Sequence, residues 1–294
     1  WYNTAEEKLY FTYDINSWTE ISAQGTTRSS TGVVGNTGAA LSVGGDDGTG
    51  VPYGSTYTEL WDGTSWTELN DTNEDQSGRG LVGTSCAAFL HSGIINQGTE
   101  GNELWNGTNW SAGPDGGSGQ GGIVGSGTAN AAIMVGSANG SGASQNCVFE
   151  WNGTDFSTGG SMPTGRASQG QAGSQNATYV WGGRLAPNTL TATSIKYNGT
   201  SWSTDVDYPV SQRIIGGSGT SNATLGFGGI PAGDTYTAEY NGISWHQTAA
   251  LNSGRYALDG AGSQSSTITS GGLPNKCSET YTTTGIGCHC IGGV

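Results

Sequence analysis

The chain has 294 residues and a formal net charge of −14. It contains only 9 Lys and Arg, too few for the basic patch that nucleic-acid phosphates or an anionic bilayer require, so we expect no nucleic-acid partner and no membrane insertion. No apolar run approaches the length of a membrane span. The 10 Trp and 12 Tyr supply apolar area for a core, which excludes a disordered chain despite the 54 Gly.

The first segment, residues 1–21, is similar to the outer part of a repeat with nothing before it. Residues 8–13 are rich in aromatics and predict a strand, and residues 17–21 predict the strand that follows. We therefore expect a hairpin here. The chain begins with Trp1 rather than Met, which indicates a processed product or a segment of a longer protein.

The first complete unit covers residues 28–69. Its four predicted strands, named A to D in chain order, cover residues 32–35, 39–43, 57–61 and 65–69. The sequence between C and D is Trp61-Asp62-Gly63-Thr64-Ser65-Trp66. Asn-Gly or Asp-Gly between strand residues is the strongest short hairpin signal, because a type I′ turn needs positive φ at both central positions. We predict such a turn here.

This turn recurs along the whole chain. The aromatic residues that open its copies are Tyr13, Trp61, Trp105, Trp151, Tyr197, Tyr240 and Tyr281. Neighbouring copies lie 41 to 48 residues apart, a period typical of one four-stranded propeller blade. We predict an all-β protein with one domain over residues 1–294, a six-bladed propeller of four-stranded antiparallel blades. The predicted blades cover residues 28–69, 76–111, 119–156, 166–203, 212–246 and 255–284.

The two ends of the chain are expected to close the propeller. The last unit has A, B and C strands but no D, whereas the N-terminal segment has a D strand without A or B. We therefore expect residues 17–21 to form the outer strand of the last blade, which removes exposed edges. One C-like strand is left over, at Tyr13 or at Tyr281, and the sequence does not decide between them. The tail, residues 285–294, matches no repeat.

The five cysteines do not form a disulfide framework by count or spacing. Cys86 and Cys147 fall in repeat strands and are expected to pack as small hydrophobic residues. Cys277 either pairs with Cys288 or Cys290 or stays free. Cys288-His289-Cys290 has one residue between its cysteines, whereas zinc sites use Cys-x₂₋₄-Cys and four ligands, so we expect no metal and no cofactor.

A double glycine that ends strand B, followed by an aromatic residue and then a Trp, resembles the Kelch repeat. Gly44-Gly45 with Trp61 and Trp66 shows the pattern well. The turn sequence of residues 61–68 resembles Kelch-like propellers of structural proteins from tailed phages, marine ones especially. The opening residues 1–13 are similar to an element of phage tail-fibre proteins.

The resemblance implies a protein at the virion surface, and therefore extracellular. It would be a fibre, decoration or adhesin that meets a host surface. The implied partners are other virion subunits in a homo-oligomeric assembly, and a host glycan or receptor.

The arginines are the first candidate for a binding site. Arg28, Arg166 and Arg255 fall at equivalent places before strand A, Arg213 falls one place later and Arg79 three. The D–A and B–C loops share one face of a propeller, so these arginines would surround the mouth of the channel. One interpretation is a site for an anion or an acidic sugar. The other, which we favour, is pairing with acids of the C strands: Glu59, Glu103, Glu150, Glu239 and Glu279.

The loops on that face are the second candidate. The B–C loops cover residues 46–53, 137–145, 184–188 and 231–236, and they differ in length while the C–D turns stay uniform. Variable loops on a repeated scaffold are the usual place for binding. Tyr53, Tyr208 and Tyr236 would be able to stack on sugars. The alternative is drift in loop sequence without a function.

Catalysis is not expected. Sialidases are also propellers with arginine clusters, but their repeated turns carry an Asp that the turns here lack. No pair of carboxylates stands out as a glycosidase pair, and His91 and His246 have no evident nucleophile beside them. We expect a non-enzymatic structural or adhesive module of a phage virion. The alternative is a secreted bacterial or environmental cell-surface protein that assembles into a filament or sheath, and a glycan-processing enzyme comes third.

Overall fold

The computed structural model describes residues 2–3, 8–48, 54–76, 80–91, 101–114, 122–138, 143–231, 235–274 and 277–291, with side chains between residues 16 and 283. These residues form β-strands and no α-helix, which confirms the all-β class. Within this part of the chain, no helix of the length and apolar character of a membrane span is found.

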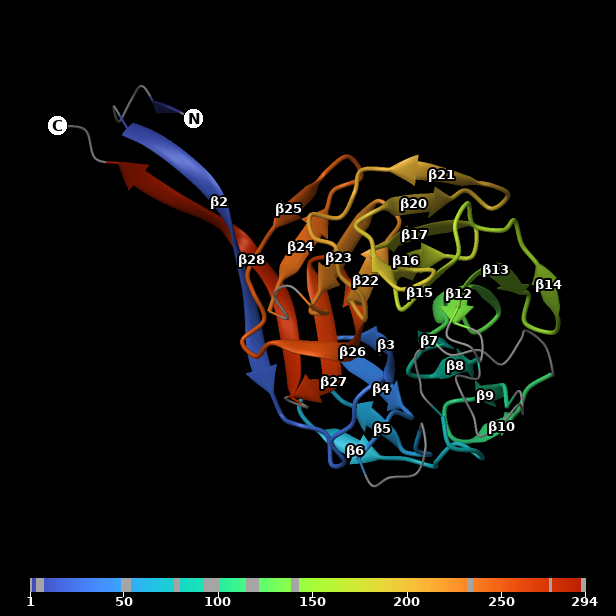
Figure 1. Cartoon of the computed structure of the whole chain (residues 1–294). Coiled ribbons are helices and arrows are strands. Elements are labelled where there is room, and N and C mark those ends of the chain that lie inside the picture. Colours follow the sequence, from blue (N-terminus) through green and yellow to red (C-terminus); the bar gives the residue numbers. More distant parts are fainter. Residues whose placement is uncertain are drawn as a thin grey trace.

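Antiparallel four-stranded sheets repeat along the chain, each built from consecutive strands (Figure 1). The first sheet consists of β3 (Gly32–Asn36), β4 (Ala39–Val43), β5 (Thr58–Trp61) and β6 (Trp66–Glu68). The second consists of β7 (Leu81–Thr84), β8 (Ala87–Leu90), β9 (Glu103–Trp105) and β10 (Trp110–Ala112). The third consists of β11 (Val124–Thr128), β12 (Ala131–Ala138), β13 (Ser144–Trp151) and β14 (Phe156–Thr158).

The pattern continues with two further sheets of the same order. The fourth consists of β16 (Gly170–Ser174), β17 (Ala177–Trp181), β20 (Ser194–Tyr197) and β21 (Trp202–Asp205). The fifth consists of β22 (Gly216–Thr220), β23 (Ala223–Phe227), β24 (Thr237–Tyr240) and β25 (Trp245–Gln247). A small extra sheet joins β15 (Arg166–Ala167), β18 (Arg184–Leu185) and β19 (Thr189–Leu190).

The last sheet contains both ends of the chain. Its order is β26 (Arg255–Ser263), β27 (Ser266–Pro274), β28 (Ser278–Ile291), β2 (Lys8–Ile21) and β1 (Tyr2–Asn3). β2 runs antiparallel to β28, with Trp18 opposite Tyr281. The expectation that residues 17–21 form an outer strand beside the last repeat is therefore confirmed.

The N-terminal segment is nevertheless not the expected hairpin. Residues 8–21 form one strand, interrupted only by a register shift between Asp14 and Ile15. No glycine stands at the turn position of this degenerate copy, so the chain has no residue suited to the positive φ of the other turns. Tyr281 therefore occupies the third-strand position, whereas Tyr13 lies opposite Gly287 in an extension of the sheet. Residues 285–291 of the tail belong to this same extension.

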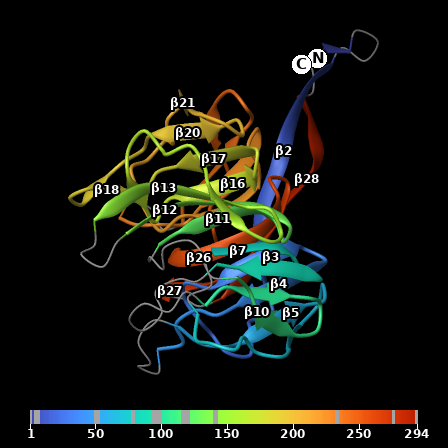
Figure 2. The ribbon, with the colours of Figure 1, turned by 90° about the vertical axis from the view of Figure 1, so that its right-hand side faces the viewer.

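The extension is a two-stranded ribbon of β2 and β28 that projects from the body of the protein (Figures 1 and 2). At its far end Leu9 pairs with both Ile291 of β28 and Tyr2 of β1. The rest of the molecule surrounds a common axis, because the first strands of successive sheets contact one another: β3 with β7, β7 with β11, β11 with β16, β16 with β22, β22 with β26, and β26 with β3. The arrangement is propeller-like.

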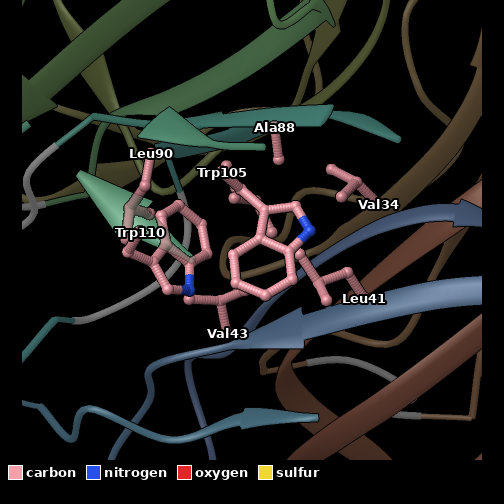
Figure 3. Packing of buried hydrophobic residues seen from close by; sticks show 8 residues of the cluster. Val34, Leu41, Val43, Ala88, Leu90, Trp105 and Trp110 are labelled. Carbon is pink, nitrogen blue, oxygen red and sulfur yellow. The ribbon is translucent and has the colours of Figure 1, made fainter. Parts of the chain in front are cut away.

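The hydrophobic core lies between neighbouring sheets. Figure 3 shows one such layer, in which Leu41 and Val43 of the first sheet meet Leu90, Trp105 and Trp110 of the second. Trp110 also donates a hydrogen bond from its indole nitrogen to the Thr58 hydroxyl, at 2.9 Å, across the same boundary. The aromatic residues of the repeated motif therefore hold adjacent sheets together.

Candidate functional site

The repeated C–D turn has a structural role. In the second sheet, the Asn106 Oδ1 accepts hydrogen bonds from the backbone N–H groups of Thr108 and Asn109, both at 2.9 Å. The same pair of bonds forms at Asp62, Asn152, Asn198 and Asn241. We call the end of the molecule that carries these turns and the A–B turns the turn face, and the opposite end the loop face.

The predicted type I′ turn is wrong in detail. Only the glycine of each copy has positive φ, for example 93° at Gly107, while the preceding Asn or Asp does not. The loop between the strands has four residues, and the side-chain oxygen takes up the amides of the third and fourth of them. In the first copy, the backbone N–H groups of Ser65 and Thr64 also lower the pKa of the exposed Asp62 carboxyl, and that of Ser65 has the larger effect. The Asn or Asp side chain and the glycine of the motif therefore both have structural roles within the turn.

Arg28 and Arg255 are buried, and each bonds to residues of its own repeat. The Nη2 of Arg28 donates to the Glu59 carboxylate at 2.5 Å, and that of Arg255 donates to Glu279 at 2.7 Å. In both residues Nη1 donates to backbone carbonyls near the end of strand B. Burial lowers the pKa of Arg28, and the charge of Glu59 opposes this shift. The favoured interpretation, pairing with acids of the C strands, is confirmed for these two arginines.

Arg166 is also buried but has no carboxylate partner in the described structure. Its Nη1 donates to the carbonyls of Gly182 and Thr193, at 3.0 and 2.9 Å, and its Nη2 donates to the Thr193 hydroxyl. Burial lowers its pKa to about 10, and the charge of Asp207 opposes the shift. The three equivalent arginines are therefore enclosed by protein rather than placed at a channel mouth. Arg79 lies outside the described residues.

The acids of the C strands fall into two groups, which the sequence prediction did not separate. Glu59, Glu103 and Glu279 stand two places before the motif aromatic and are buried. Glu150 and Glu239 stand one place before it, on the other side of the strand, and accept hydrogen bonds from the hydroxyls of Tyr197 and Tyr281. Successive side chains of a strand point to opposite faces, so only the first group is able to reach an arginine.

Glu103 shows that this position does not require an arginine. It accepts hydrogen bonds from the backbone and side-chain nitrogens of Asn73 and from the N–H of Glu74. Burial nevertheless raises its pKa. The predicted pairing of Glu103, Glu150 and Glu239 with arginine is thus wrong for the described residues.

Arg213 differs from the other arginines because it is one position later in the chain. In four repeats a residue at the start of strand A has positive φ, and the residue before it pairs with the segment after strand B. Arg213 stands before such a residue, Ile214, and pairs with Ile230 through two backbone hydrogen bonds of 2.9 and 3.0 Å. Its side chain is partly exposed on the loop face. Within the described part of the chain, its guanidinium makes no hydrogen bond or ion pair.

A shallow depression surrounds this arginine. It has a volume of about 210 Å³ and is lined by Asn188, Leu190, Arg213, Ile230 and Pro231. Asn188 and Leu190 come from the β18–β19 hairpin inserted between the second and third strands of the fourth sheet. Arg213 precedes β22, the first strand of the fifth sheet, and Ile230 and Pro231 follow β23, its second strand. The predicted loop of residues 184–188 is therefore a short hairpin that forms one wall of the depression.

The three predicted tyrosines do not form a sugar platform together. Tyr208 is 1% exposed and packs edge-on against Tyr236, with ring centroids 5.9 Å apart. Burial raises its pKa well above the usual value. Tyr236 is partly exposed, and Tyr53 lies outside the described residues. The loops of residues 46–53, 137–145 and 231–236 are likewise described only in part.

A series of backbone hydrogen bonds follows the axis from the third sheet round to the first, at the loop-face end of the A strands. Four non-glycine residues there have positive φ of 57° to 60°: Ser30, Ser168, Ile214 and Ala257. The N–H of Ser168 donates to Gly122, Ile214 to Ser168, Ala257 to Ile214, and Ser30 to Ala257. Each bond joins neighbouring sheets, so the unusual backbone conformation links the repeats around the axis.

An axial cavity of about 160 Å³ lies further along the same strands. Glycines contribute much of its wall, and Asp259 is the charged residue among its described lining. The Asp259 carboxylate accepts hydrogen bonds from the N–H groups of Val33 and Gly260, at 3.2 and 2.9 Å. The carboxylate therefore accepts hydrogen bonds from the backbone of two adjacent sheets.

The cysteines and histidines are the remaining candidates. No cluster of three or more His, Cys, Asp or Glu suited to a metal is found among the described residues. Cys277 is a free thiol, and burial raises its pKa. The side chains of Cys288, His289 and Cys290 lie outside the described part. His91 is buried, with its Nδ1 2.7 Å from the Asn102 Oδ1, and His246 lies near Ser244 at the edge of a turn.

No protein-family model matches the chain, and no curated protein matches it.

Proposed function

We propose that the chain is a six-bladed, Kelch-like β-propeller that acts as a non-enzymatic structural and adhesive module of a phage virion. In this proposal the loop face meets a glycan or protein of the host surface. The repeated sheets, the sequential contacts of their first strands and the N-terminal strand beside β28 support the propeller. The glycine and tryptophan pattern of the repeats supports the Kelch-like type.

The observation that carries the adhesive function is the difference between the two faces. On the turn face, the same residues make the same hydrogen bonds in copy after copy. On the loop face, one sheet carries an extra hairpin, and a partly exposed arginine lies beside it in a depression. A repeated scaffold that varies at one end only is typical of a binding protein.

The composition of the depression supports binding rather than catalysis. Its described lining offers a guanidinium, an amide and three apolar side chains. An arginine and an amide orient a ligand by charge and hydrogen bonds, whereas general acid–base chemistry uses a group that titrates near the operating pH. The role in a virion, the extracellular location and the association with other subunits follow from the resemblance of residues 61–68 and 1–13 to phage structural proteins.

A glycan array tests the adhesive part. The fluorescently labelled protein is applied to immobilised bacterial surface glycans at low and at physiological salt. We expect binding to a restricted set of glycans. Binding of acidic glycans should be stronger at low salt, because salt screens the attraction between an exposed cation such as Arg213 and an anionic group. Absence of binding at every salt concentration would contradict adhesion to a glycan and favour a purely structural role.

A further inference from the structure

Arg213 differs from four of the other basic side chains that the structure describes. Arg28 and Arg255 form buried ion pairs, and Lys196 forms a partly exposed one with Asp205 at 2.9 Å. Arg166 donates to two backbone carbonyls and a hydroxyl. The chain has 9 Lys and Arg against 23 Asp and Glu, so few cations are available to bind an anion. The guanidinium of Arg213 makes no such bond within the described structure and is therefore a candidate anion-binding group.

The backbone at Arg213 is fixed independently of its side chain. Its N–H and C=O groups both pair with Ile230, and the next residue, Ile214, belongs to the series of hydrogen bonds that links neighbouring sheets near the axis. The corresponding residues of other sheets, those before the left-handed position, are Ser29, Ala167 and Tyr256. The scaffold therefore accepts a small or aromatic side chain at this place, so folding does not explain why the fifth sheet has an arginine.

The surroundings of Arg213 favour a small ligand with an anionic group. Asn188 adds an amide that is able to donate and accept hydrogen bonds. Leu190, Ile230 and Pro231 supply an apolar surface beside these polar groups. The volume of about 210 Å³ is below the range of about 300–1,000 Å³ typical of pockets that enclose a drug-sized molecule, which favours recognition of a single residue of a larger ligand.

We infer that the depression binds one acidic sugar residue of a glycan, with Arg213 holding its carboxylate, Asn188 bonding a ring hydroxyl, and the apolar residues contacting the C–H face of the sugar. A guanidinium is suited to this task because its parallel N–H groups match the two oxygens of a carboxylate. This inference rests on the proposed adhesive function and names the ligand class for the same face.

The test compares two trisaccharides that differ only in the terminal residue, glucuronic acid in one and glucose in the other. Their affinities are measured by calorimetry at low salt for the wild-type chain and for the Arg213→Ala, Arg213→Lys and Ile243→Ser variants. Ile243 is 78% exposed in the C–D turn of the same sheet, so its variant is the matched control on the turn face. Thermal unfolding of each variant verifies that the fold is retained.

We expect the wild-type chain and the control to bind the acidic trisaccharide at least about tenfold more tightly than the neutral one. Arg213→Ala should lose this preference, and Arg213→Lys should retain only part of it, because a lysine is not able to form the bidentate pair. Equal affinity of the wild-type chain for the two sugars, or an unchanged preference in Arg213→Ala, would overturn the inference.

Three further outcomes distinguish failure of this inference from failure of the proposed function. Tighter binding of a sulfated trisaccharide than of the carboxylated one would overturn the assignment to a carboxylate, while adhesion would stand. Glycan-array binding that persists in Arg213→Ala would place the adhesive contact elsewhere on the protein. Absence of all glycan binding would instead contradict glycan adhesion together with this site.

Discussion

The buried pair of Arg255 and Glu279 offers a sharp test of how the last sheet is stabilised. Both side chains are 0% exposed, and their closest charged atoms are 2.7 Å apart. The second carboxylate oxygen accepts hydrogen bonds from the backbone and side chain of Asn252, at 2.9 and 3.0 Å. Glu279→Gln keeps the shape of this group but removes its charge, and thus leaves the Arg255 cation buried without compensation.

The expected loss is large for a single substitution. Removal of one partner of a buried ion pair costs about 3–5 kcal/mol, and we expect a value near about 3 kcal/mol because the Gln carbonyl still accepts one hydrogen bond. The entropy of unfolding is about 2.1 cal/mol/K per residue, or roughly 0.6 kcal/mol/K for a chain of this size. The melting temperature should therefore fall by about 5 °C.

The control is Asp205→Asn, which breaks the pair of Lys196 and Asp205. Their side chains are 22% and 19% exposed, so water and salt already weaken the interaction, and its loss should cost at most about 1 kcal/mol. Differential scanning calorimetry at pH 7 measures both variants. A shift for Glu279→Gln no greater than that for Asp205→Asn would refute the claim that the Arg255–Glu279 pair is screened from water.

Three further substitutions test other parts of the structure. Trp18→Ala removes a side chain that packs on Phe227 and Tyr281. Urea unfolding should show that the free energy of unfolding falls by about 3–5 kcal/mol. A fall below about 1 kcal/mol would mean that β2 contributes little to the stability of the last sheet. Ile214→Gly should change the free energy of unfolding by less than about 1 kcal/mol, because the release of the strain at φ 60° offsets the lost contacts. The same substitution at the neighbouring buried Ile215 should lower it by at least about 3 kcal/mol. Equal losses of stability in the two variants would argue against strain at Ile214. Tyr208→Phe should not destabilise the protein at pH 7, since the buried hydroxyl has no hydrogen-bond partner in the described structure. Because the pKa of this tyrosine is raised in the folded state, its contribution to stability is present below the usual tyrosine pKa and is lost as pH rises above it; urea titrations above pH 10 should therefore show a shallower decline for the variant, and an identical slope would contradict the raised pKa.

The repeat made much of the architecture predictable. Aromatic spacing and the Gly-Gly ends of the second strands indicated the sheets, and the missing outer strand of the last repeat predicted the role of residues 17–21. The turn at Tyr13 was mispredicted because sequence similarity outweighed the lack of a glycine. Its strand continues into a ribbon whose partner is the tail, and that partner lies more than 250 residues away in the sequence.

The candidate site was predictable only in part. Arg28 and Arg166 fall at equivalent places in their repeats and Arg213 one place later, and all were predicted to lie at the channel mouth. That shift of one residue separates a buried side chain from a partly exposed one. The period of two along a strand was the available signal, and it also distinguishes Glu59 from Glu150. The contribution of Leu190 and Ile230 depends on how a hairpin of one sheet meets the next, which no local pattern of residues reports.

The orientation of the propeller on a native particle tests the central claim most directly. Electron microscopy of purified virions, with the propeller fitted into the density, resolves which end of the axis faces outwards. Our account predicts propellers at the particle surface, with the depression around Arg213 exposed on the outer end. Particles that lack the protein, or propellers whose loop face is buried against other subunits, would contradict it.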